Sequence, residues 1–250
     1  MMKLLAKRLT MLAAASVVAA SIARAESPVE LGAGVDLLTD YVWRGQLLTD
    51  DPVIQPYAEI GAYGLTLNVW GSIDMTDINE AGNEDFRLQE VDYTLSYGFT
   101  PVDGLDLEGG IIYYDFPGTA FDSTREVYAS ASLSKVPLTP TATVYYDFDE
   151  VDGIYATLGV GHTFELAEDL GLSLGAGLGW GDEDYNTAYF GVTDSGLNDL
   201  SLKASLDYAL TEMFSISAYV AYSELLDSDI EDAVADSDIF YGGVGFYFSY

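Results

Sequence analysis

The sequence predicts an all-β transmembrane protein, an antiparallel up-and-down β-barrel of about twelve strands. Apolar and polar residues alternate with period two along segments of about 10 residues, which is typical of strands with one apolar and one polar face. After residue 25 no run of about 18 apolar residues could form a membrane-spanning helix, although 49% of the residues are hydrophobic. Only helices and closed barrels pair every backbone group inside a bilayer, so a barrel is favoured. A soluble β-sandwich would also alternate, but with strands of about five or six residues.

The first 25 residues have the composition of a secretory signal peptide. Basic residues precede an apolar stretch over residues 9–22, and an A-x-A cleavage site ends at Ala25. This order of basic, apolar and small residues predicts export of the chain and removal of residues 1–25. The remaining residues, 26–250, are expected to form one domain, the outer-membrane barrel.

The expected mature chain is strongly acidic. Four of the nine Lys and Arg residues and none of the 41 Asp and Glu residues lie in the signal peptide, which leaves a formal charge of −36. This charge excludes nucleic acid as a partner, because phosphate contacts need a basic surface. It favours cations as partners, or a salty medium that screens the self-repulsion of the chain. The chain has no cysteine, which excludes disulfides and thiolate metal sites.

Turn signals divide the rest of the chain into the expected strands. These lie at about 29–46, 53–62, 64–75, 86–99, 104–116, 124–135, 140–149, 153–166, 170–182, 198–211, 213–225 and 237–250. In the segment 153–166, for example, Ile154, Leu158 and Phe164 share one face. Period two that is sustained over so many segments excludes amphipathic helices.

The connections between these segments alternate between two kinds. Mostly tight turns are expected at 62–64, 100–104, 134–140, 167–171 and 211–212. Mostly longer, acidic loops are expected at 47–52, 76–85, 117–123, 182–199 and 226–237, with one short loop at 150–153. Short periplasmic turns and longer external loops are typical of an even-numbered barrel with both termini in the periplasm.

The last strand carries a further signal. Phe246, Phe248 and Tyr250 lie on one face of the segment that ends the chain, and small or hydroxylated residues occupy the other face. A final strand with an aromatic carboxyl terminus resembles the closing strand of bacterial outer-membrane barrels. The resemblance implies an assembly signal for the outer-membrane assembly machinery, a location in the outer membrane of a Gram-negative cell, and contact with outer-membrane lipids.

Strand parity assigns a set of polar residues to the barrel interior. The expected pore-lining residues are Asp36, Asp40, Arg44, Gln55, Glu59, Asp74, Glu90, Asp92, Asp106, Glu108, Glu126, Asp147, Lys203 and Asp207. Carboxylates that line a wet lumen attract cations and repel anions. The sequence therefore predicts a narrow, cation-preferring channel for passive diffusion. The alternative is a packed interior, whose charges pair with Arg44 and Lys203.

Arg44 is the interior base with the clearest sequence context. It shares its parity with Asp36 and Asp40, so the three residues are expected to form one lumen-facing row. An arginine in such a row would form a fixed, charge-assisted bridge to a carboxylate, which is bidentate where the geometry allows two parallel bonds. Arg44 would then act as a selectivity-setting constriction or, as we favour, as a brace inside the barrel.

The same segment resembles a known family of outer-membrane porins, the TorF family. The residues that carry the resemblance are Thr39, Asp40, Tyr41, Arg44, Gly45, Pro52 and Gln55. The similarity extends over most of residues 26–250 and implies an outer-membrane barrel of the porin kind without catalytic residues. The sequence departs from the family pattern at Trp43 and at residues 47–48.

Other constellations favour neither an enzyme nor a metal or cofactor site. His162 is the single histidine, and its parity places it on the lipid face, where it has no nucleophile to activate. The pairs Glu90 with Asp92 and Asp106 with Glu108 could serve a hydrolase, but such i,i+2 carboxylates simply share a strand face. The acidic loops 182–184 and 227–238 lack the spacing of a calcium loop.

Two further expectations concern the surroundings of the barrel. Trp43, Trp180 and the tyrosines near strand ends are expected to form girdles at the membrane interfaces. If the lumen does not conduct, the alternative function is a structural or interaction barrel whose acidic external loops bind ions or a partner.

Overall fold

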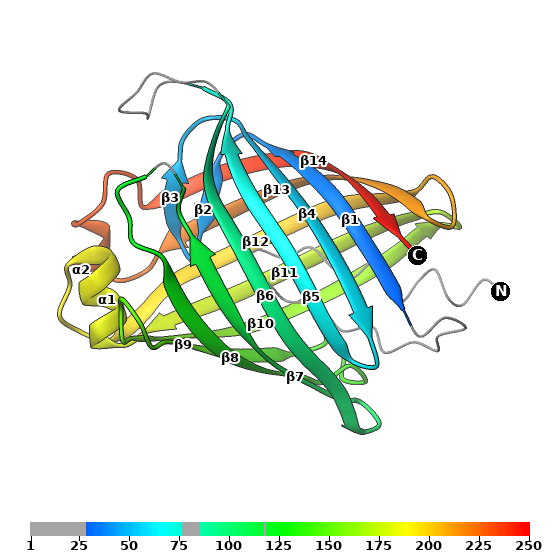
Figure 1. Ribbon diagram of the computed structural model, residues 1–250, viewed down its shortest axis with the longest axis horizontal. Helices are drawn as coiled ribbons and strands as arrows, with labels where there is room; N and C mark the ends of the chain where they lie inside the picture. Colours follow the sequence, from blue (N-terminus) through cyan, green and yellow to red (C-terminus); the bar gives the residue numbers. More distant parts are fainter. Residues whose placement is uncertain (1–28, 77–85, 118) are drawn as a thin grey trace.

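The computed structural model describes residues 29–76, 86–117 and 119–250. The expected signal peptide, residues 1–25, lies outside the described residues, as does most of the expected loop 76–85. Twelve strands close into an antiparallel barrel in which each strand pairs with its neighbours along the chain (Figure 1). The fold class predicted from the sequence is therefore confirmed.

The barrel strands follow one another in sequence order. They are β1 (Glu30–Leu38), β4 (Val53–Ala62), β5 (Leu65–Asp74), β6 (Arg87–Val102), β7 (Leu105–Asp115), β8 (Thr124–Ser132), β9 (Thr141–Asp147), β10 (Ile154–Ala167), β11 (Leu170–Gly181), β12 (Gly196–Ala209), β13 (Phe214–Leu225) and β14 (Asp238–Ser249). Apart from the first strand, the expected boundaries agree with these to within a few residues. Two short strands, β2 (Tyr41–Trp43) and β3 (Gln46–Thr49), form a separate hairpin.

The barrel closes between its first and last strands. β1 pairs with β14 from Gly32 opposite Ser249 to Leu38 opposite Gly243. The backbones of Leu31 and Tyr250 exchange two hydrogen bonds of 3.0 and 2.8 Å, so the ladder continues to the carboxyl terminus. Closure leaves no unpaired sheet edge between these strands, as a bilayer requires.

Side chains alternate between a buried inner face and an exposed outer face. In β10, Ile154, Leu158 and Phe164 are exposed, whereas Tyr155 between them is 2% exposed. In β14, Phe246 is exposed and Tyr241 on the opposite parity is buried. The apolar outer face and polar inner face expected from the sequence are present.

The first predicted strand is wrong in its extent. β1 ends at Leu38, where the sequence predicted one strand over 29–46. The backbone N–H of Thr39 donates to the Gly242 carbonyl oxygen at 2.9 Å, and the β1–β14 ladder ends there. The chain then enters the β2–β3 hairpin. Arg44 and Gly45 form the hairpin turn with φ of 47° and 82°. Positive φ at both central residues is the geometry of a tight two-residue hairpin turn, which reverses the chain where parity alone would continue it.

Two loops contain short helices that the sequence did not predict. α1 (Glu183–Phe190) begins after Asp182, whose carboxylate accepts a hydrogen bond from the backbone of Tyr185. α2 (Ser228–Glu231) begins after Asp227, which caps its helix in the same way. Neither of these helices, which are the described ones, is long and apolar enough to cross a membrane.

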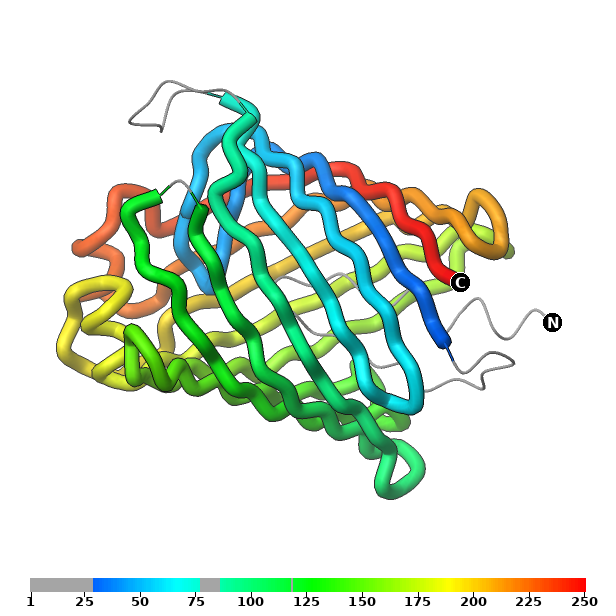
Figure 2. The backbone as a smooth tube through the Cα atoms, viewed as in Figure 1, coloured from blue at the N-terminus to red at the C-terminus, as the bar shows by residue number. Residues whose placement is uncertain are grey.

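The two ends of the barrel differ in structure. The start of β1 and the carboxyl terminus lie at one end, which we call the terminal end (Figure 1). The helices α1 and α2 lie at the opposite end, which we call the loop end, and the β2–β3 hairpin lies toward that end (Figures 1 and 2).

Candidate functional site

The β2–β3 hairpin folds into the barrel and approaches the wall at β12 and β13. A Cβ atom added to Gly45 at the hairpin tip would lie 2.7 Å from Leu225 Cδ2 and 2.8 Å from Asp199 Cβ. Leu225 ends β13 and Asp199 lies in β12, whereas the hairpin leaves the sheet between β1 and β4. The tip therefore projects into the interior, and glycine is the residue type that both its positive φ and this close approach allow.

An ion pair fixes the hairpin tip to a third part of the wall. The Arg44 guanidinium donates from Nη1 and Nη2 to the two carboxylate oxygens of Glu126 on β8, at 2.8 and 2.7 Å. The side chains of Arg44 and Glu126 are 1% and 3% exposed. The Tyr114 hydroxyl donates a third bond to Glu126 at 2.7 Å. A bidentate, fully desolvated pair of this kind has a fixed geometry.

Aromatic rings surround the same guanidinium. The Arg44 Cζ atom lies 4.3 Å from the ring centroid of Trp43, 4.4 Å from that of Tyr145 and 4.6 Å from that of Tyr155. Aromatic faces carry partial negative charge, so these contacts stabilise the buried cation in addition to Glu126. Tyr155 is held in turn by donating to Asp199 at 2.7 Å.

Helix α1 covers this cluster at the loop end. The rings of Tyr155 and Tyr185 lie 5.0 Å apart between centroids, and those of Tyr185 and Tyr189 lie 4.6 Å apart. Burial raises the pKa of the Tyr185 phenol. A Cβ atom on Gly153 would lie 2.5 Å from the backbone nitrogen of Tyr185, so the short loop before β10 approaches the helix closely. The loop half of the interior is thus packed around Arg44.

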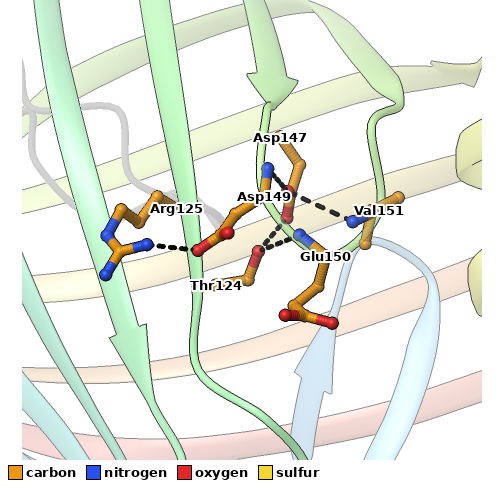
Figure 3. A network of polar contacts seen from close by, with 6 residues as sticks. All are labelled: Thr124, Arg125, Asp147, Asp149, Glu150 and Val151. Carbon is orange, nitrogen blue, oxygen red and sulfur yellow. Dashed lines mark hydrogen bonds and ion pairs between the residues drawn. The ribbon is translucent and has the colours of Figure 1, made fainter.

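A polar network orders the rim beside this cluster (Figure 3). Asp147 accepts hydrogen bonds from the Thr124 hydroxyl at 2.6 Å and from the backbone of Asp149 at 2.9 Å and Val151 at 3.3 Å. Arg125 on the outer face forms an ion pair with Asp149. The Asp147 carboxylate is therefore committed to holding the β9–β10 loop.

Other predicted lining residues bond to hydroxyl or amide groups inside the barrel. Asp207 accepts from Ser173, Ser205 and Ser217 at 2.8, 3.0 and 2.6 Å. Asp36 accepts from Tyr247. Each of these carboxylates thus accepts hydrogen bonds from hydroxyl groups. The packed-interior alternative from the sequence had expected them to pair with Arg44 or Lys203.

The same holds for several acids near the two ends. Glu108 accepts from Tyr128 at 2.6 Å, Asp106 from Thr100 at 2.6 Å, and Glu59 from Asn68 at 3.4 Å. Two further contacts complete this set: Asp74 accepts from Gln89 at 3.1 Å, and Gln55 donates to Ser72 at 3.4 Å.

Glu90 and Asp92 follow one another on the inner face of β6. Glu90 is 6% exposed. Asp92 Oδ1 is buried and has no hydrogen-bond partner among the described residues. Asp40 is half-buried in the link between β1 and β2.

Lys203 is the second interior base. Its ammonium nitrogen lies 3.7 Å from the centroid of the Tyr219 ring on β13. Arg44 and Lys203 are each stabilised by aromatic rings, and of these two bases Arg44 is the one paired with a carboxylate.

Two interior expectations need correction. Arg44 does not form a row with Asp36 and Asp40, because it lies at a hairpin turn and not on a continuous strand. Trp43 is not part of an interfacial girdle, since its ring packs inside against Arg44 and Tyr114. The dipeptide Arg44-Gly45 between two short apolar segments was the sequence signal for this hairpin.

The sequence reasoning also missed interior residues. Asp199 lies in the expected strand 198–211 but was not assigned to the interior, and it is buried on β12. The tyrosines Tyr114, Tyr145 and Tyr155 were not assigned to the interior site, although their inward parity was readable. Nothing in the sequence alone shows that rings from four separate elements meet one guanidinium.

The remaining candidates lie away from the interior. His162 is exposed on the outer face as expected, with its ring 4.6 Å from that of Phe164. Asp182 and Asp227 from the acidic loops cap α1 and α2. Within the described residues, no three His, Cys, Asp or Glu side chains are grouped so that they could hold a metal ion.

Comparisons with known proteins agree with this architecture. A family model described as "MltA-interacting protein MipA" matches residues 31–250. The fold is similar to the COG4313 outer membrane channel from Pseudomonas putida F1, with a TM-score of 0.56 at 8% identity over 94% of this chain and 100% of that one. It is also similar to the KdgM porin, with a TM-score of 0.54 at 12% identity over 88% and 99% of the two chains. For the NanC porin the TM-score is 0.53 at 12% identity, over 88% and 98%. No curated protein matches the chain.

Proposed function

The chain belongs to the MipA family, and we propose that it is an outer-membrane channel for small solutes with a preference for cations. One observation carries the proposal: two interior bases, Arg44 and Lys203, face a much larger set of interior carboxylates. The TorF-like residues and the fold shared with outer-membrane channels and porins support it. We propose that the barrel is exported with a cleaved signal peptide and sits among outer-membrane lipids.

The charge balance gives the preference a physical reason. Glu126 neutralises Arg44 at 2.7 Å, so that pair adds no net charge to the lumen. The hydroxyl-bonded carboxylates Asp36, Glu108 and Asp207 remain, with Lys203 as the opposing cation. Such a lumen lowers the energy of a passing cation and raises that of an anion.

The hairpin sets the size limit in this proposal. Its tip contacts β12 and β13 at Gly45 and is bonded to β8 through Arg44. A solute that crosses the barrel must pass beside the hairpin or displace it, so we propose that the Arg44 cluster is the constriction.

Planar bilayer recording tests the proposal. A folded barrel in a potassium chloride gradient should show small, steady conductance steps, with a reversal potential of the sign that potassium permeability gives. Replacing Glu108 and Asp207 together with Gln and Asn should shift that potential toward zero. A reversal potential near zero for the unmodified protein, or one of anion sign, would refute the cation preference.

A second candidate function is a non-conducting interaction barrel, with acidic external loops that bind ions or a partner. The family's description as an MltA-interacting protein and the packed loop half of the interior around Tyr155 and Tyr185 favour it. Silence in bilayers from correctly folded protein, together with co-purification of MltA from membranes, would support this candidate and contradict the channel.

We propose no catalytic role. His162 lies on the outer face beside Phe164, away from the interior carboxylates. An enzyme would hydrolyse a lipid or peptide, and the His162→Ala variant tests that possibility by loss of such an activity.

A further inference from the structure

The ammonium group of Lys203 has unused hydrogen-bonding capacity inside the barrel. It lies over the Tyr219 ring at 3.7 Å and forms no ion pair with any carboxylate that the structure describes. A lysine ammonium has three donors and no acceptor, and a ring face satisfies it only in part. The remaining donors are available to a group in the lumen.

The neighbouring carboxylates have other partners. Asp207 accepts from three serine hydroxyls at 2.6–3.0 Å, which occupies most of its roughly four lone-pair positions. Asp36 accepts from the Tyr247 hydroxyl. The register places both acids in one row across the sheet, since Ser217 lies opposite Asp207 and Gly245 lies opposite both Ser217 and Asp36. Neither acid forms an ion pair with Lys203.

Small residues flank Lys203 on both sides. Its partner on β11 is Gly175 and its partner on β13 is Ala221. The next inward position on β12 is Ser201, which lies opposite Gly177. At these pairing positions the two adjacent strands carry no bulky side chain, and the Tyr219 ring of β13 is the aromatic group that contacts the ammonium.

We propose that Lys203, positioned by Tyr219, forms a lumen subsite for the carboxylate of a small zwitterion such as an amino acid. This inference rests on the proposed channel function. A solute with only negative charge is repelled by the interior acids, and a simple cation is repelled by the Lys203 ammonium. A zwitterion interacts favourably with both kinds of interior charge, because its carboxylate binds Lys203 while its ammonium faces the carboxylates across the lumen.

Ligand-observed NMR on the folded, detergent-solubilised protein tests the subsite with two matched probes. L-alanine carries both charges, and L-alaninamide keeps the ammonium but lacks the carboxylate. L-alanine should show saturation transfer from the unmodified protein, and its apparent affinity should fall about tenfold or more in Lys203→Gln, as expected for loss of a charged hydrogen bond. The saturation transfer to L-alaninamide should be the same in Lys203→Gln and in the unmodified protein.

Two variants make the comparison specific. Lys135→Gln removes the same charge from an exposed turn, where Lys135 pairs with Asp103, and should bind L-alanine as the unmodified protein does. Lys203→Arg keeps the charge and should retain binding if the barrel is intact, as shown by heat-modifiable migration on a gel.

The outcomes separate this subsite from the channel. Equal L-alanine affinity in folded Lys203→Gln and unmodified protein, or no L-alanine binding at all, overturns the subsite even if potassium conductance is observed. Lys203-dependent L-alanine binding in a protein that is silent in bilayers supports the subsite and contradicts the channel.

Discussion

Replacing Arg44 with methionine should destabilise the barrel by about 3–5 kcal/mol, because it leaves a buried charge without its partner. The Arg44 and Glu126 side chains are 1% and 3% exposed, so water cannot replace the lost bonds. Glu126 would retain only the 2.7 Å bond from Tyr114. Loss of the contacts with Trp43 and Tyr145 at 4.3 and 4.4 Å adds about 0.5–2 kcal/mol to the cost.

Urea unfolding in lipid vesicles, followed by tryptophan fluorescence, measures this loss. The double variant Arg44→Met with Glu126→Leu should recover much of the stability, since it removes both charges, and the cycle should give a coupling energy of about 3 kcal/mol. Arg125→Gln is the matched control. Its ion pair with Asp149 has side chains that are 47% and 31% exposed, and an exposed pair contributes about 0–1 kcal/mol.

The reasoning is refuted if Arg44→Met costs no more than Arg125→Gln. Such a result would mean that water reaches the guanidinium, and therefore that the hairpin does not lie packed inside the barrel.

Three further predictions concern single residues. Gly45→Ala should displace the hairpin tip, because an alanine strains the turn and overlaps Leu225; single-channel conductance should rise. Asp182→Ala should weaken α1 by about 1 kcal/mol through loss of its N-cap, which faster hydrogen exchange of the Tyr185 amide would report. Phe248→Ser should lower the amount of barrel in the outer-membrane fraction, whereas Phe240→Ser on the same strand should not.

Each of these has a contrary result. Unchanged conductance in Gly45→Ala would place the tip away from the passage. Unchanged exchange in Asp182→Ala would mean that tertiary packing alone holds the helix. Equal loss from Phe248→Ser and Phe240→Ser would show a general fold defect in place of a carboxyl-terminal assembly signal.

The barrel was predictable because every membrane-spanning strand has the same two surroundings, one on each face. A strand between hydrocarbon and a polar interior must alternate with period two, and this is why the expected segment 53–62 coincides with β4. The same parity assigned Asp36 and Glu126 to the inner face, and both residues are buried.

The hairpin was not predictable by parity. Residues 41–43 continue the alternation of β1, and only the positive φ of Arg44 and Gly45 reverses the chain. Helix α1 was missed for a related reason. Its acidic first turn reads as a solvated loop, and the burial of Tyr185 that anchors it arises from tertiary contacts.

Disulfide trapping tests the position of the hairpin most directly. A Cβ atom on Gly45 would lie 2.8 Å from Asp199 Cβ, and disulfides form with Cβ atoms about 3.5–4.5 Å apart, so a small shift suffices. The chain has no cysteine, so the Gly45→Cys, Asp199→Cys variant contains a single possible bridge. If the hairpin lies inside the lumen, mild oxidation of the folded barrel should form the disulfide. A maleimide added afterwards in denaturant should then label neither cysteine. Labelling of both thiols in a folded barrel would contradict it.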